Sequence, residues 1–145
     1  MILDLLTLFS DSQAVTVDAA STNVIDLGAP GKAAYNQVQL VRNNKGDCIP
    51  VLIQVTEDFA TLTSLVVKIQ GSVDEAFTSP IDLAASPSIA VATLKAGYIF
   101  RMLPELPKNN IYRYIRMYYD CTGSTATAGK ITAGITTAVD AGYKG

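Results

Sequence analysis

The chain has 145 residues, of which 49% are hydrophobic and 17% charged, a composition that favours one folded domain over residues 1–145 and excludes general disorder. Eleven Lys and Arg against thirteen Asp and Glu give a net charge of −2 without a concentrated basic stripe, so we expect no nucleic-acid partner. Histidine is absent, which excludes Ser-His-Asp, Cys-His and His-containing zinc sites. We therefore expect no catalytic residues, no metal, no cofactor and no enzymatic activity.

Residues 1–9, MILDLLTLF, form an apolar leader interrupted by Asp4. The leader lacks a basic start and a small-residue cleavage site, and no apolar run approaches the roughly 20 residues that cross a bilayer. We expect a cytoplasmic product without membrane contact. The leader is either an arm over residues 1–12 that docks on a partner, or a first strand folded onto the chain's own core. The side chains concerned are Ile2, Leu3, Leu5, Leu6, Leu8 and Phe9.

Apolar and polar residues alternate from about residue 36 onward, which predicts an all-β chain. Strands are expected at 14–17, 24–27, 37–40, 51–56, 65–70, 89–93, 98–103, 112–121 and 130–136, with a hairpin turn at 43–47 and short helical turns at 57–62 and 92–97. About eight or nine strands separated by turn clusters are typical of a two-sheet jelly-roll β-sandwich. A closed barrel is the alternative architecture.

The strand expected at 112–121 carries the most suggestive group of side chains. Ile115, Met117 and Cys121 share one face, which should point inward, and Tyr114, Arg116 and Tyr118 share the other. Tyrosine and arginine dominate the energetics of protein interfaces, so this second face is a candidate contact with a partner protein or with another copy of the chain. The alternative is a solvent-facing strand whose aromatic rings pack only on neighbouring strands.

Three other features of the sequence give weaker indications of a functional site. Gly28 and Gly31 are too close together for a phosphate-binding loop, and Lys32 is not followed by Ser or Thr, so an ordinary turn is expected. Asp74 and Glu75, with Asp82, are expected to form a solvated acidic loop rather than a calcium site or an acid/base pair. The two cysteines, Cys48 and Cys121, are expected to be unpaired packing residues.

Six stretches of the chain resemble the cement, or decoration, proteins of tailed-bacteriophage heads, of the small jelly-roll type found on podophage-like capsids. They are FSDSQAVTV, AASTNVIDLGAPG, VDEAFTSP, LKAGY, RYIRMYYDCTG and TAGKITAGI, and they follow the family's order over most of the chain. The loop LPELPKNN, at 103–110, is least similar.

The resemblance implies a structural virion protein, made in the host cytoplasm, that sits on the outer capsid surface. Such a protein binds the major capsid protein, bridges its subunits and stabilises the shell. It implies neither catalytic residues nor a transferable binding motif. A self-complementary patch favours a homodimer on a two-fold position, and a trimer is the other possibility.

Two other functions compete with the cement reading. A lectin-like or receptor-binding jelly-roll module on the virion would bind a glycan, and the nearest candidate for a sugar site is Tyr112 with Asp120. A small enzyme of unfamiliar type is the third class. A glycan binder would be retained on a carbohydrate column and released by free sugar, whereas a cement protein would associate stoichiometrically with heads.

Overall fold

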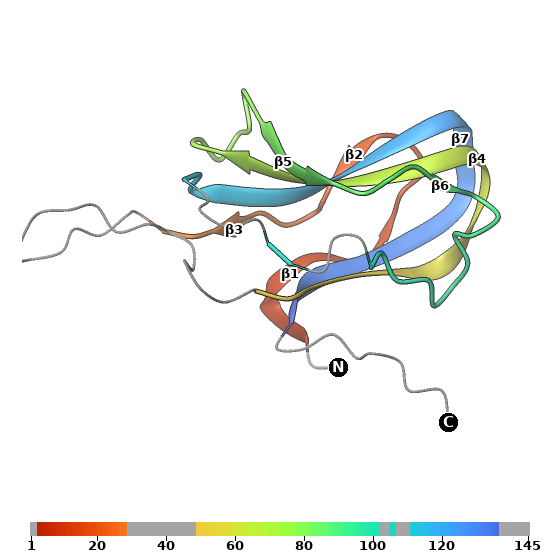
Figure 1. The fold of residues 1–145 in the computed structure, drawn as a ribbon, viewed down its shortest axis with the longest axis horizontal. Coiled ribbons are helices and arrows are strands. Elements are labelled where there is room, and N and C mark those ends of the chain that lie inside the picture. Colours follow the sequence, from red (N-terminus) through yellow and green to blue (C-terminus); the bar gives the residue numbers. More distant parts are fainter. Residues whose placement is uncertain (1–2, 29–48, 102–104, 107–110, 137–145) are drawn as a thin grey trace, which may run out of the picture.

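The chain forms an all-β structure, described in a computed structural model for residues 3–28, 49–101, 105–106 and 111–136. Two of its strands, β4 and β7, are more than 20 residues long and run the length of the molecule (Figure 1). The strands are β1 (Leu3–Ala14), β2 (Ala19–Ala20), β3 (Ile25–Asp26), β4 (Val51–Ser72), β5 (Ile81–Ala85), β6 (Ile89–Ala90) and β7 (Tyr114–Thr136).

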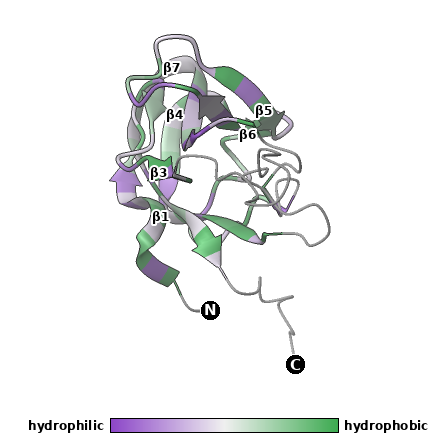
Figure 2. Cartoon of the chain, turned by 90° about the vertical axis from the view of Figure 1, so that its left-hand side faces the viewer, coloured by the Kyte–Doolittle hydropathy of each residue, from purple (hydrophilic) through white to green (hydrophobic). Residues whose placement is uncertain are grey.

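All seven strands belong to one antiparallel sheet with the order β1-β7-β4-β5; β2 and β3 also pair with β7, and β6 pairs with β4. The central pair runs from Val51 opposite Ile135 to Ser72 opposite Tyr114. This sheet curls over, so that β1 lies near the bottom of the molecule and β5 near the top in both views (Figures 1 and 2). The expected two-sheet sandwich is therefore corrected to one curled sheet.

The curl divides the sheet into two limbs that face each other. The β1 limb consists of β1 with residues 51–56 of β4 and 130–136 of β7, and the β5 limb consists of β5 with residues 64–72 of β4 and 114–122 of β7. Because both central strands continue from one limb into the other, the two layers that the sequence suggested are halves of the same strands.

The bend explains why a helical turn was wrongly expected at 57–62. These residues continue β4, but the register with β7 shifts repeatedly between Val55 and Ser64. Thr61 has a φ of 71°, and its hydroxyl donates to Thr125 O at 2.7 Å and accepts from Thr127 N at 3.0 Å. Such bulges bend and twist a strand, and they interrupt the apolar alternation on which the prediction depended.

The core lies between the two limbs. Ile53 of β4 and Ile131 of β7 enter the core from the β1 limb, and both are fully buried. Ile69 of β4 and Met117 of β7 enter it from the β5 limb and are also fully buried. Phe9 of β1 and Leu94 of the loop after β6 complete the packing, each 0% exposed. One long alternating strand thus covers both sides of the core.

Several predicted strands are present but with different bounds. The predictions at 51–56 and 65–70 are both parts of β4. The prediction at 130–136 is part of β7, and the one at 112–121 belongs to it from Tyr114 onward. The predictions at 24–27 and 89–93 correspond to the two-residue β3 and β6. The strand expected at 37–40 and the hairpin turn at 43–47 lie outside the described residues.

Other predictions fail at the strand ends. Residues 15–17 follow the end of β1 rather than forming a strand. The strand expected at 98–103 is present only as an isolated bridge between Gln54 and Ile99, flanked by backbone hydrogen bonds from Val55 N to Tyr98 O and from Phe100 N to Ile53 O; residues 102–103 lie outside the described residues. The turn at 92–97 is present: Leu94 N donates to Val91 O, and Gly97 has a φ of 92°. It is a series of turns rather than a helix. In the described part of the chain, no helix has the length and apolarity to cross a bilayer.

Candidate interaction surfaces

The outer face of β7 in the β5 limb carries Tyr114, Arg116 and Tyr118, each half-buried. Between them, Ile115 and Met117 point into the core and are 1% and 0% exposed. The alternation therefore places the three candidate residues on the side of the strand away from the core. Their role as an interface stays a prediction.

Arg116 is the centre of this face. Its guanidinium carbon lies 4.2 Å from the centre of the Phe77 ring and 5.8 Å from that of Tyr118. Its Nε donates to Oε1 of Gln70, on the neighbouring β4, at 3.0 Å. Burial lowers the pKa of Arg116, an effect that Tyr118 partly opposes. The arginine is thus held over aromatic rings rather than extended into solvent.

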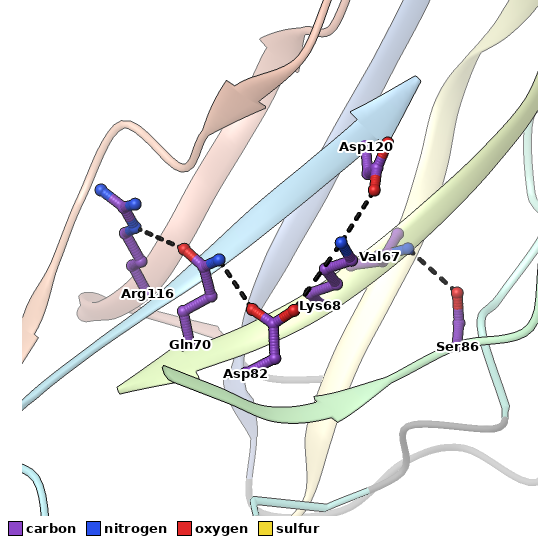
Figure 3. A network of polar contacts seen from close by, with 7 residues as sticks. All are labelled: Val67, Lys68, Gln70, Asp82, Ser86, Arg116 and Asp120. Carbon is purple, nitrogen blue, oxygen red and sulfur yellow. Dashed lines mark hydrogen bonds and ion pairs between the residues drawn. The ribbon is translucent and has the colours of Figure 1, made fainter. Parts of the chain in front are cut away.

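A network of polar contacts continues from Gln70 across the same face (Figure 3). Nε2 of Gln70 donates to Oδ1 of Asp82, on β5, at 2.8 Å. Lys68 of β4 forms ion pairs with Asp120 at 2.8 Å and with Asp82 at 3.7 Å, and Asp120 in particular raises the pKa of Lys68. Three strands are therefore joined by side chains as well as by the backbone ladder.

The acidic loop expected around Asp74 and Glu75 has a structural role at Asp74. Its side chain accepts a hydrogen bond from Thr78 N at 3.1 Å, and its backbone carbonyl accepts one from Phe77 N. This turn holds Phe77 at a φ of 52° and brings its ring beneath Arg116. Within the described ranges, no group of three or more metal-ligating side chains is assembled.

A second arginine, directly before β7, is paired with a carboxylate. Nε and Nη2 of Arg113 donate to the two carboxylate oxygens of Asp26, at 2.8 and 2.7 Å, which raises the pKa of Arg113. Its guanidinium also lies 5.0 Å from the Tyr114 ring centre. The pair fastens β3 to the start of β7.

The apolar leader is divided between the core and the surface. Residues from Leu3 onward form β1 and pair with the end of β7, and Leu8 and Phe9 are buried at 8% and 0% exposure. Leu5 and Leu6 project outward and are 74% and 86% exposed. Figure 2 shows the colour of β1 changing between hydrophobic and hydrophilic along its length. Leu3 is half-buried, and Ile2 lies outside the described residues.

The exposed leucines border a shallow groove of about 620 Å³. Its wall continues with the apolar Leu8 and Val24 and with the polar Thr22, Asn23 and Glu75, and Val24 is 38% exposed. The edge of the sheet therefore offers exposed leucines beside a groove of mixed polarity, where the sequence suggested either an arm or a packed strand.

The proposed sugar pair is not assembled. The ring of Tyr112 lies against Gly71, whose position would bring a Cβ within 2.9 Å of that ring. Asp120 stands opposite Val66, five positions before Gly71 in β4, and binds Lys68. Tyr112 and Asp120 therefore contribute to different parts of the sheet.

Cys121 is unpaired and half-buried, and Cys48 lies outside the described residues. Burial, with the nearby charges of Asp18 and Asp120, raises the pKa of the Cys121 thiol to about 11.

Gly28 ends a described segment with a φ of 78°, and its N–H donates to Asp26 at 2.8 Å in a tight turn. Lys32 lies outside the described residues.

We call the surface formed by Tyr114, Arg116 and Tyr118 with the side chains around them the Arg116 face. Sequence reasoning missed Phe77, Gln70 and Asp82 as parts of it. Phe77 stands in a loop, and Asp82 belongs to β5, which the alternation did not reveal. Gln70 was placed on a strand, but its contact depends on the register that sets it opposite Arg116. No short-range signal in the sequence indicates that register.

Together, the fold and these surfaces define an all-β protein built on one curled antiparallel sheet, with an aromatic and charged outer face and an apolar edge. A family model named Bbp16 matches residues 9–135. The chain therefore belongs to the Bbp16 family, a bacteriophage protein family. Among curated proteins, none matches the chain.

Proposed function

We propose that this chain is a cement protein of a bacteriophage head: a non-enzymatic structural protein that binds the outer capsid surface and stabilises the shell. The observation that carries the proposal is membership in a phage protein family over residues 9–135. The resemblance of six ordered stretches to capsid cement proteins supports the specific role. In this proposal, the protein is made in the host cytoplasm and its partner is the major capsid protein.

Two surfaces of the structure suit such a role. Tyr114, Arg116 and Tyr118 present residue types that are enriched at binding hot spots. Leu5 and Leu6 are large apolar side chains left exposed on an edge strand, where a partner would remove them from water.

The protein would hold capsid subunits together through several weak contacts made at the same time. Each fully buried leucine contributes roughly 1.5–3 kcal/mol, so one pair such as Leu5 and Leu6 is too little to hold a shell subunit by itself. If two copies form a dimer on a two-fold position, the second capsid contact becomes effectively intramolecular and the affinities combine. A trimer on a three-fold position would work by the same principle.

The test is sedimentation with phage heads that lack the protein. The purified chain should pellet with the heads, saturate at a fixed ratio and delay heat-induced release of the packaged DNA. Failure to pellet at any ratio, while the protein stays folded, would contradict the cement role. Retention on a carbohydrate column, with release by free sugar, would instead indicate a glycan-binding module.

A further inference from the structure

The guanidinium of Arg116 is held in place from two directions. The Phe77 ring lies beneath it at 4.2 Å, and its Nε is bound to Gln70, which is bound in turn to Asp82. A cation anchored in this way loses little conformational freedom when a ligand binds its remaining nitrogens. The side chain is therefore prepared for a contact that it does not make within the described chain.

The terminal nitrogens of Arg116 have no carboxylate partner among the described residues. In Figure 3 they point away from Gln70 and from the rest of the network. Arg113 provides the contrast, because Asp26 occupies both its Nε and its Nη2. Arg113, just before β7, thus has its counter-charge, whereas Arg116 of β7 has none among the described residues.

The nearest acidic side chains of the network are already engaged. Lys68 binds Asp120 and Asp82. Arg116 is meanwhile half-buried, so it has lost part of its hydration without gaining an opposite charge. A cation in that condition gains more from a charged hydrogen-bond acceptor than a fully hydrated one does.

We propose that Arg116 binds the carboxylate of an acidic side chain on a partner protein, through Nη1 and Nη2. The proposal rests on the proposed function, in which that side chain belongs to a capsid subunit. A carboxylate has two oxygens that match the two terminal nitrogens. A phosphate group carries more negative charge, and here Asp82 and Asp120 on the same sheet face, in a chain of net charge −2, would oppose it.

The ligand class can be tested without any partner. In the ¹⁵N-labelled protein, the Nε–Hε signal of Arg116 is followed during titration with sodium acetate, sodium phosphate or sodium chloride at matched ionic strength. Acetate should shift the signal saturably and by more than chloride does, whereas the signal of Arg113 stays in place. An equal response to acetate and chloride, or a stronger response to phosphate, would overturn the carboxylate assignment.

The partner can be tested with heads that lack the protein. R116Q should bind heads about tenfold more weakly or worse, because a charge-assisted contact is lost, and R116K should also bind more weakly because a lysine cannot donate two parallel bonds. The control K95Q removes one positive charge from an exposed ion pair with Asp58 and should bind like the wild type.

These results separate the two proposals. If the wild type pellets and both R116K and R116Q pellet equally well, the inference about Arg116 is wrong and the cement role stands. If the wild type does not pellet, the cement role fails, and the acetate titration alone decides whether Arg116 is a carboxylate site. The melting temperature of R116K, which keeps the charge over Phe77, verifies that the fold is intact.

Discussion

At the scale of single residues, Gly129 shows how the bend in the sheet depends on the absence of a side chain. Its φ is 137°, and a Cβ at this position would lie 2.3 Å from the buried ring of Phe59. Gly97 also has a positive φ, 92°, but a Cβ there would meet nothing within 4 Å. A side chain at either position would strain the backbone, but only at Gly129 would it also collide with a neighbouring side chain.

Gly129→Ala should destabilise the protein by about 2–6 kcal/mol, because roughly 1–3 kcal/mol of backbone strain adds to roughly 1–3 kcal/mol of overpacking. Gly97→Ala should cost only the strain, roughly 1–3 kcal/mol. Urea unfolding of both variants measures the difference. Equal losses of unfolding free energy would show that the contact with Phe59 is not a constraint on the bend.

Cys121 gives a residue-scale prediction about pH. Its pKa in the folded protein is about 11, above its ordinary value of 9.0, chiefly because burial disfavours the thiolate. The folded state therefore holds this proton more tightly than the unfolded chain. The resulting contribution to stability is complete below pH 9 and is lost as the pH rises through 11.

The variant Cys121→Ser, whose hydroxyl does not titrate in this range, should lose less stability than the wild type between pH 9 and pH 11. Urea unfolding at a series of pH values provides the measurement. A second readout is the alkylation of Cys121 by iodoacetamide, which should be slow at neutral pH because little thiolate is present. Parallel stability curves for the two proteins would contradict the raised pKa.

At the scale of elements, β1 shows what alternation can and cannot predict. The apolar leader was recognised, but its six large side chains gave no means of deciding which of them pack. The register with β7 decides this: Leu8 stands opposite Gly134, and the adjoining Phe9 enters the core, whereas Leu5 and Leu6 fall in a stretch where the pairing shifts. Pairing partners more than 100 residues away cannot be read from a local pattern.

The same reasoning applies to β4, β7 and the Arg116 face. Alternation identified both halves of each long strand and the side of β7 that carries Tyr114, Arg116 and Tyr118. It could not join the halves, because the bulges near Thr61 break the period of two. It also could not place Phe77 beneath Arg116, since that contact depends on a turn at a positive φ. The lack of a carboxylate partner for Arg116 among the described residues is likewise a property of the assembled sheet.

Two substitutions in β1 should therefore have opposite effects. Leu6→Ser should leave the melting temperature nearly unchanged, because the side chain is 86% exposed, but should weaken binding to heads. Phe9→Ala should destabilise the fold by about 3–5 kcal/mol because it empties a fully buried site.

The control for head binding is Val17→Ser, which removes another exposed apolar side chain, 52% exposed, outside β1. It should bind heads like the wild type. If Leu6→Ser also binds like the wild type, then the apolar edge of β1 is not a capsid contact, although the prediction for Phe9 would be unaffected.

At the scale of the whole molecule, the two limbs should unfold together. Both central strands, β4 and β7, pass through the bend, and the two limbs pack against one shared core. Side chains and backbone also join the limbs across the interior: the Ser10 hydroxyl of β1 lies 2.7 Å from that of Tyr119 in β7, and Asn23 N donates to Phe9 O at 2.9 Å. Ser10 and Tyr119 are both fully buried, and separating the limbs would remove the bond from the Tyr119 hydroxyl, whereas Ser10 would keep its bond to Gln13.

We therefore expect one cooperative transition even when only one limb is weakened. Ile131→Ala acts in the β1 limb and Met117→Ala in the β5 limb, and each should lower the unfolding free energy by about 2–5 kcal/mol, since both side chains are 0% exposed. In each variant, the amide signals of residues 51–56 and 114–120 should disappear at the same urea concentration. Loss of the first set before the second in Ile131→Ala, with the reverse order in Met117→Ala, would show that the limbs are independent units and that the bend is only a linker between them.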